Sequence, residues 1–183
     1  TAPEARGQRL FRPLLETAFE VLRSQEFPFA LLMPINAGIY LPYEFSFCYY
    51  RHKYDMPLAK LKVAEEGSAL RVERTSLNKE VLAPLYQECT KTWNGVPVRT
   101  DFQWNKLLKV HAMENVQCAI VHKEENAVGY MLYKLQDDTF NVLELMAQDL
   151  AARNRLLQFA ASHKSEAKHF TWLAEAWDKS YLN

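Results

Sequence analysis

Cysteine and glycine are scarce in this sequence. The 183 residues include three cysteines and five glycines. Cys48, Cys89 and Cys118 are far apart in apolar surroundings, with no CxxC motif and no Cys/His spacing typical of a metal site. We therefore expect three buried thiols in a reducing compartment, the cytoplasm, and no bound metal.

Long apolar runs and an excess of one charge are also absent. No continuous apolar run is long enough to cross a membrane, so no membrane-spanning helix is expected. Lys+Arg and Asp+Glu both number 22, so the formal net charge is zero and gives no bulk attraction to nucleic acid or an anionic membrane. The sequence begins at Thr1 rather than Met and shows no signal peptide, so we expect a fragment or a processed product.

Several kinds of catalytic or binding motif are missing as well. The five histidines form no HxH or HxxxH pair, and no GxSxG nucleophile motif occurs. His111 lies on an apolar helix face, so we interpret it as a core histidine. The aromatic and basic run at residues 49–54 has the composition of a single-strand nucleic-acid site, but we interpret it as an exposed strand end.

The first third of the chain predicts a helix followed by strands. Apolar residues recur at steps of three and four over residues 9–24, the pattern of an amphipathic helix. Apolar or aromatic runs predict strands at residues 29–33, 44–51 and 60–63. The polar residues 65–68 carry the best linker signal, so we place a domain boundary between residues 66 and 67.

The rest of the chain predicts a second series of elements. Ser76 and Asp101 are expected to cap two helices, the second carrying Trp104. The other expected elements are strands at residues 70–72, 116–122, 127–135, 140–146 and 170–173 and a helix at residues 150–162. This order predicts an α/β (α+β) fold in which mixed sheets are flanked by helices.

Residues 3–10 form the first candidate binding site. Gly7 lies just before the first helix, with Arg6 and Arg9 beside it. Glycine lets the backbone N–H groups at a helix N-terminus point at a ligand, and the helix dipole favours a phosphate or pyrophosphate there. Taken alone, a plain N-terminal turn is the commoner explanation of such a glycine.

The second candidate is Tyr40, one helix and one expected strand further along the chain. It follows turn residues at 36–38 and precedes Tyr43 and Phe45. Taken alone, this pattern favours a core aromatic residue.

Both segments resemble the GNAT superfamily of N-acyltransferases, and most closely its enhanced-intracellular-survival (Eis) type. The run Arg6-Gly7-Gln8-Arg9-Leu10 resembles the R-G-x-G-[IL] pyrophosphate loop, and Gly38-Ile39-Tyr40 resembles the G-I-Y run. Two positions depart from the pattern: Glu4 stands where Gln or Arg is usual, and Arg9 stands where Gly or Ala is usual.

The resemblance implies a mechanism and its residues. Arg6, Gly7, Gln8, Arg9 and Leu10 would hold the pyrophosphate of acetyl-CoA, and Tyr40 would be the general acid that protonates the departing thiolate. A phenol, with a pKa near about 10, suits a thiolate leaving group. No metal enters this mechanism.

The second half of the chain resembles a degenerate GNAT-like domain. The features that carry this likeness are Gly95-Val96-Pro97-Val98-Arg99 before Trp104, Val128-Gly129-Tyr130 and Val142-Leu143-Glu144-Leu145. Residues 147–149 contain no glycine where the pyrophosphate loop would be, so this half is expected to be structural and to line the acceptor pocket. The resemblance thus divides the chain into the C-terminal half of an acetyl-CoA-binding GNAT domain (residues 1–66) and a second GNAT-like domain (residues 67–183). It also implies further domain sequence before Thr1 and after Asn183.

The function that follows is acetyl transfer from acetyl-CoA to a primary amine of a small molecule or a protein lysine. Neither nucleic acid nor a membrane is expected as a partner, and relatives of this type form homo-oligomers. One alternative is a non-catalytic acyl-CoA-binding or interaction module on the same scaffold, favoured by Arg9. Another is an unrelated α/β domain whose motif matches arose by chance.

Overall fold

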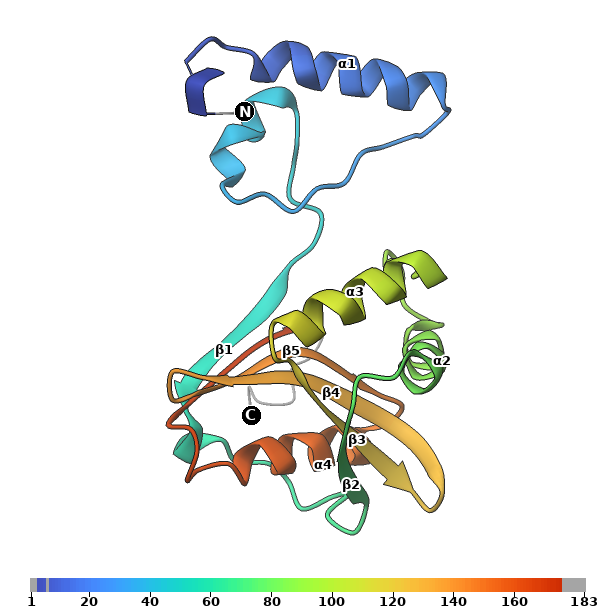
Figure 1. Ribbon diagram of the computed structural model, residues 1–183, viewed down its shortest axis with the longest axis vertical. Helices are drawn as coiled ribbons and strands as arrows, with labels where there is room; N and C mark the ends of the chain where they lie inside the picture. Colours follow the sequence, from blue (N-terminus) through green and yellow to red (C-terminus); the bar gives the residue numbers. More distant parts are fainter. Residues whose placement is uncertain (1–2, 6, 176–183) are drawn as a thin grey trace. The chain divides into compact units, whose positions relative to one another are not determined.

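The computed structural model describes residues 3–5 and 7–175. The chain forms two compact units, Thr1–Cys48 and Tyr49–Asn183, and each is described by itself (Figure 1). The boundary predicted between residues 66 and 67 lies inside the second unit, because the strand Arg51–Pro57 pairs with that unit's sheet. The compact units and the predicted domains therefore divide the chain at different places.

The first unit is organised around one helix. Helix α1 (Phe11–Ser24) confirms the helix predicted at residues 9–24. Short 3-10 turns accompany it: η1 (Pro3–Ala5), η2 (Ala37–Ile39) and η3 (Leu41–Tyr43). No described residue of this unit is fully buried. The unit therefore depends on a few half-buried side chains for its packing.

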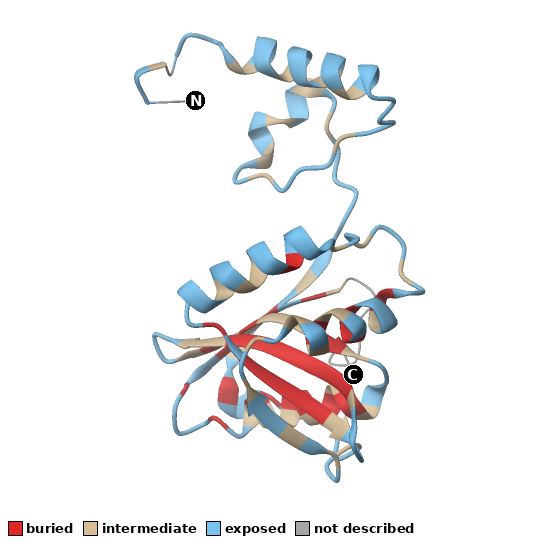
Figure 2. Ribbon diagram, turned by 45° about the vertical axis from the view of Figure 1, so that its right-hand side comes forward, coloured by how far each residue is buried: buried red, intermediate tan, exposed pale blue. Residues whose placement is uncertain are grey.

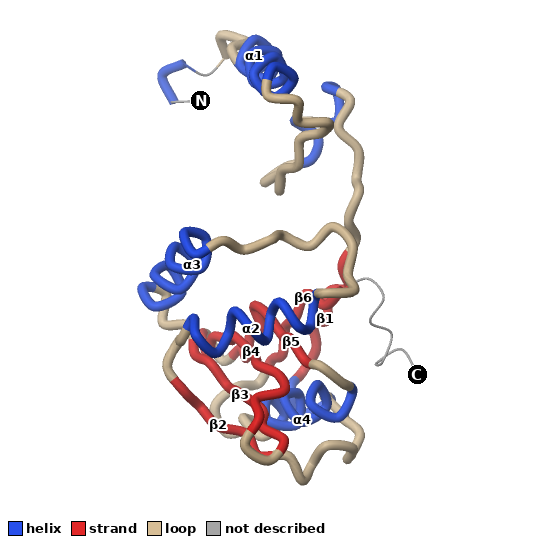
Figure 3. Tube along the Cα trace, turned by 90° about the vertical axis from the view of Figure 1, so that its right-hand side faces the viewer, coloured by secondary structure: helices blue, strands red, loops and turns tan. Residues whose placement is uncertain are grey.

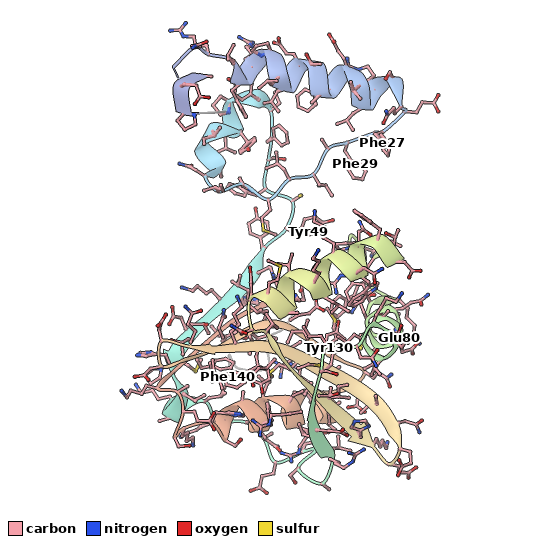
Figure 4. All side chains as sticks on the ribbon, in the orientation of Figure 1. Phe27, Phe29, Tyr49, Glu80, Tyr130 and Phe140 are labelled. Carbon is pink, nitrogen blue, oxygen red and sulfur yellow. The ribbon has the colours of Figure 1, made fainter. Side chains whose placement is uncertain are left out.

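Two predicted strands in and after this unit are wrong. Residues 29–33 are irregular, and Phe29 and Met33 are 70% and 93% exposed (Figure 4 labels Phe29). An extended segment becomes a strand only when a neighbour completes its backbone hydrogen bonds, and the described residues of the first unit form no strand. In the strand predicted at residues 44–51, Glu44 has a φ of 66° and residues 45–50 are irregular, and the strand begins only at Arg51.

The second unit contains a six-stranded sheet. Its strands are β1 (Arg51–Pro57), β2 (Arg71–Thr75), β3 (Gln117–Lys123), β4 (Asn126–Gln136), β5 (Thr139–Ala147) and β6 (His169–Glu175). Their order across the sheet is β1-β6-β5-β4-β3-β2. Every neighbouring pair is antiparallel except β5 and β6, which are parallel. The predicted strands at residues 70–72, 116–122, 127–135, 140–146 and 170–173 are confirmed with small shifts at their ends.

Helices cover both faces of this sheet (Figures 1 and 3). One face packs against α2 (Lys79–Thr90) and α3 (Asp101–Met113), and the other packs against α4 (Leu150–Ala161). A separate hydrophobic core lies on each face of the sheet, and alternate residues of β3 and β4 belong to one core or the other. Cys118, Ile120, Tyr130 and Leu132 face α2 and α3, and Ala119, Val121, Met131 and Tyr133 face α4. Both faces are covered, which suits the continuous apolar runs in the middle of β3 and β4, coloured as buried in Figure 2. The predicted α/β fold of a mixed sheet flanked by helices is confirmed.

The connections follow local sequence signals. Asp137 and Asp138 both have positive φ, 51° and 58°, which is the geometry of a tight turn between antiparallel strands. The predicted strand at residues 60–63 is wrong, because the chain instead forms the 3-10 turn η4 (Leu58–Lys60). The N–H of Leu58 donates a hydrogen bond to the carbonyl of Lys168 at 2.7 Å, which anchors that turn beside β6.

The caps of α2 and α3 lie close to the predicted residues but not on them. Asn78, rather than Ser76, caps α2 by accepting a hydrogen bond from the N–H of Glu80. Thr100, rather than Asp101, caps α3 in a reciprocal arrangement with Gln103. The Gln103 side-chain oxygen accepts from the Thr100 N–H at 2.8 Å, and the Thr100 hydroxyl accepts from the Gln103 N–H at 3.4 Å.

Replacing Thr100 with alanine is expected to lower the free energy of unfolding by about 1 kcal/mol, because the first turn of α3 loses its side-chain acceptor. Urea unfolding followed by tryptophan fluorescence measures the loss. Thr100→Ser keeps the hydroxyl and serves as the matched control. Equal midpoints for the alanine and serine variants would show that the cap contributes nothing.

Candidate active site

The loop before α1 is open around Gly7, the residue predicted to approach a pyrophosphate. Gly7 has a φ of 80°, and a Cβ added to it would meet no heavy atom within 4 Å. Packing therefore does not require a glycine here, whereas the backbone conformation favours one. The space beside Gly7 is free for a ligand.

The start of α1 leaves its first backbone N–H groups without a side-chain cap. Leu10 occupies the N-cap position and makes no capping hydrogen bond. The first N–H groups of any α-helix lack partners within the helix, and they attract a phosphate when no side chain satisfies them. Gln8, Arg9 and Leu10 are exposed in this loop, while Arg6 lies outside the described residues.

Arg9 has a φ of 56°, in the left-handed region. A residue with a side chain adopts this conformation at a cost of about 1–2 kcal/mol, whereas glycine adopts it freely. The GNAT loop pattern usually has Gly or Ala at this position. Arg9 therefore occupies a position whose backbone conformation suits glycine.

Tyr40 lies at the junction of η2 and η3. Asn36 caps the first of these turns by accepting from the N–H of Gly38 at 2.9 Å. The Tyr40 N–H donates to the Ala37 carbonyl, and the Tyr40 carbonyl accepts from the Tyr43 N–H, both at 2.9 Å. The backbone of Tyr40 is thus fixed on both sides, and its side chain is half-buried.

An aromatic contact brings the loop and Tyr40 together. Phe11 is the first residue of α1 and directly follows the loop. Its ring lies edge-on to the ring of Tyr40, with centroids 5.4 Å apart and planes at 77°. Tyr40 therefore packs on the residue that directly follows the predicted loop, although Leu10 and Tyr40 are 30 residues apart in sequence. The roles of Tyr40 and of the loop residues stay predictions.

Helix α4 of the second unit, unlike α1, has a side-chain cap at its N-terminus. Asp149 caps α4, and its carboxylate accepts from the N–H of Ala152 at 2.7 Å. A carboxylate in this position satisfies the helix N-terminus and repels a pyrophosphate. This local geometry agrees with the expectation that the second unit lacks the cofactor loop.

A charged cluster that sequence analysis missed lies between α2, α3 and the sheet. Glu144 on β5 accepts hydrogen bonds from both terminal nitrogens of Arg99 and from the hydroxyl of Tyr130 on β4 (Figure 4 labels Tyr130). The guanidinium of Arg99 also lies over the rings of Tyr86 and Trp104, 4.0 and 4.8 Å from their centroids. Glu144 could have indicated this cluster from the sequence, because it is a charged residue within the apolar run of β5. A charge in a core needs a partner.

Burial and the charge of Glu144 shift the pKa of several groups in and around this cluster. Burial lowers the pKa of Arg99, but the hydrogen bond and the charge of Glu144 outweigh it, so that the pKa of Arg99 is raised. Burial raises the pKa of Tyr130 and of Tyr86. Burial lowers the pKa of His111, whose Nδ1 is buried without a hydrogen-bond partner. The cluster is therefore a fixed ion pair that ties residues 94–100 to the sheet.

The cysteines do not all match the sequence prediction. Cys118 is buried and Cys89 is half-buried, but Cys48 is exposed, so the expectation of three buried thiols is wrong for Cys48. Burial raises the pKa of the Cys89 thiol to about 11 and that of Cys118 to about 12, which makes both weak nucleophiles at neutral pH.

Within residues 3–5 and 7–175, no group of three or more His, Cys, Asp or Glu side chains is arranged to hold a metal. In the same described part of the chain, no helix has the length and apolar character needed to cross a membrane.

Comparison with family models gives the same description for both units. Residues 1–48 match one model of an acetyltransferase (GNAT) domain, and residues 95–182 match another. Each unit therefore contains a segment that matches a GNAT domain model, and neither match by itself covers half of the chain. The first match ends at the boundary of the first compact unit, at Cys48. GNAT acetyltransferases use acetyl-CoA and act on amine acceptors. The search of curated proteins gave no match.

Several solved structures share the fold of this chain. A probable N-acyltransferase from Enterococcus faecalis is 22% identical with a TM-score of 0.80 and aligns with 94% of this chain. A GCN5-related N-acetyltransferase from Kribbella flavida is 21% identical with a TM-score of 0.75 over 100% of this chain. Eis1 from Mycobacterium abscessus is 17% identical with a TM-score of 0.72 over 97%. This chain spans 44%, 45% and 47% of those three structures, and at these identities the likeness concerns the fold.

Proposed function

We propose that this chain is part of an Eis-type acyltransferase that moves an acetyl group from acetyl-CoA to a primary amine. The acceptor is an amine of a small molecule or of a protein lysine, and the compartment is the cytoplasm. The observation that carries the proposal is the meeting of the open glycine loop and Tyr40 at Phe11, 5.4 Å between ring centroids. The proposal covers the whole protein, of which this chain supplies these two elements.

The proposed reaction needs no covalent enzyme intermediate. The amine nitrogen bonds to the thioester carbonyl carbon, and the C–S bond breaks as the tetrahedral intermediate collapses. The departing thiolate takes the phenolic proton of Tyr40, which regains a proton from solvent. The nitrogen loses its proton to a base, for which the described residues offer no assignment. Backbone N–H groups of the Gly7 loop hold the pyrophosphate during these steps.

Calorimetric titration with acetyl-CoA tests the loop in the natural full-length protein. Gly7→Val is expected to weaken binding at least about tenfold, because a β-branched residue resists a φ of 80° and its methyl groups occupy the free space beside the backbone. Ser24→Ala, at the other end of α1, is the control and should bind like the wild type. Wild-type protein that does not bind acetyl-CoA would refute the loop assignment.

One observation favours a second function, a non-catalytic acyl-CoA-binding module. Arg9 carries a side chain at a left-handed position of the loop, which narrows the approach to the backbone. Thiol release from acetyl-CoA, measured with a panel of aminoglycosides and polyamines, separates the two functions. Binding without thiol release for any acceptor would support the module and exclude the enzyme.

A further inference from the structure

Tyr40 is held between two aromatic rings. On one side is Phe11, and on the other is Phe45, whose ring centroid lies 5.6 Å from that of Tyr40 at an interplanar angle of 73°. Phe11 also lies edge-on to Tyr43, at 5.3 Å and 71°. Such edge-to-face pairs fix ring orientation as well as ring position.

The rings of Phe11 and Phe45 both act on the orientation of the Tyr40 side chain, because both pack directly on its ring. Hydrogen bonds of the two 3-10 turns fix its backbone but leave the side-chain torsions free. No described residue of the first unit is fully buried, so no surrounding core restrains the ring. The contacts with Phe11 and Phe45 therefore contribute to the direction of the phenolic hydroxyl.

Phe11 differs from Phe45 in its connection to the loop. It directly follows Leu10, so its ring moves with the start of α1 and with the loop around Gly7. A shift of the loop would therefore reach Tyr40 through the packed contact between Phe11 and Tyr40. This arrangement would align the hydroxyl of Tyr40 with the loop that would hold acetyl-CoA.

We propose that Phe11 is a positioning residue that orients the Tyr40 hydroxyl relative to the loop at Gly7. This proposal rests on the proposed function of Tyr40 as general acid. Phe11 itself contributes no group to the chemistry. Its effect passes entirely through the Tyr40 ring.

The chain offers a matched control on the same helix. Phe19 lies two turns further along α1, and its ring packs on Phe45 with centroids 5.9 Å apart. Both phenylalanines are half-buried and belong to the same aromatic cluster. Replacing Phe19 removes a comparable contact from the unit without removing the contact between Phe11 and Tyr40.

The activity test is a double-mutant cycle in the full-length protein, with thiol release as the readout. Phe11→Leu is expected to lower kcat about 10- to 100-fold with little change in KM for acetyl-CoA, because small misplacement of a catalytic group has effects of this size. Phe11→Tyr, which keeps the ring, is expected to stay near wild type. Phe19→Leu, which reaches Tyr40 only through Phe45, is expected to lower kcat less than Phe11→Leu does. In a Tyr40→Phe background, Phe11→Leu should cause no further loss, since its effect requires the hydroxyl. Full additivity of the two substitutions, or an unchanged kcat for Phe11→Leu, would overturn the proposal.

A second readout separates this proposal from the proposed function. In protein with labelled tyrosine, the ring resonances of Tyr40 report the neighbouring rings whether or not the protein is active. Phe11→Leu should shift these resonances more than Phe19→Leu does. If the wild type releases no thiol, or if Tyr40→Phe keeps full activity, the general-acid role fails. Unmoved Tyr40 resonances in Phe11→Leu would refute the positioning role on their own.

Discussion

Tyr40→Phe is expected to lower kcat for acetyl transfer by about 10²–10⁴-fold, the range over which a positioned proton donor acts. Removing one hydroxyl leaves the ring and its contacts with Phe11 and Phe45 in place. KM for acetyl-CoA is expected to change little, because the proposed contribution of the hydroxyl arises only as the thiolate departs. Steady-state thiol release at saturating amine measures both constants.

Tyr43→Phe is the control for this result. Tyr43 is three residues away, and its ring packs on Phe11 at nearly the same distance as the ring of Tyr40 does, 5.3 against 5.4 Å. It should retain its kcat, because the proposed chemistry makes no use of its hydroxyl. Equal losses in the two variants would assign the effect to the cluster as a whole, and full activity of Tyr40→Phe would remove Tyr40 from the mechanism.

Glu144→Ala is expected to lower the free energy of unfolding of the second unit by about 3 kcal/mol. The side chains of Arg99 and Glu144 are only 17% and 16% exposed, so the substitution leaves a largely buried guanidinium without its counter-ion. Removal of one partner from a buried ion pair typically costs about 3–5 kcal/mol, and the remaining exposure places this pair at the lower end. The hydroxyl of Tyr130 loses its acceptor at the same time.

The matched experiment replaces both members of the pair. Arg99→Met with Glu144→Leu fills a similar volume with apolar groups, and this double variant should be more stable than Glu144→Ala. Glu125→Gln changes an exposed carboxylate in the turn between β3 and β4 and should leave stability within about 0.5 kcal/mol. Urea unfolding, followed by tryptophan fluorescence because Trp104 lies beside Arg99, gives all three values. A Glu144→Ala variant as stable as Glu125→Gln would show that the pair is not a stabilising element.

Sequence patterns predicted the second unit well because its signals are local. The tight turn at Asp137 and Asp138 and the buried run of β4 each depend on neighbours in the chain. The cap positions of α2 and α3 were missed by one or two residues, since several residues there have a suitable side chain and only the backbone conformation selects one.

The first unit shows where such patterns are insufficient. Residues 29–33 have the apolar composition of a strand, but strand formation depends on a partner that composition does not specify. The motif residues Gly7 and Tyr40 were found in the sequence, whereas the contact through Phe11 was not, because nothing in the spacing indicates which ring meets which. The pairing of Arg99 with Glu144 likewise joins residues far apart in the chain.

The pairing of β1 with β6 has a consequence for biosynthesis. Arg51 lies opposite Glu175 and Pro57 opposite His169, so the first strand of the sheet pairs with the last. During translation β1 leaves the ribosome long before its partner exists, and its backbone groups must remain hydrated until then. Closing so long a loop is entropically costly, and non-local strand pairs form slowly. The pairing of β1 is therefore completed only after synthesis has passed Glu175, the last residue of β6. A nascent chain arrested before β6 would present β1 as an unpaired, association-prone segment.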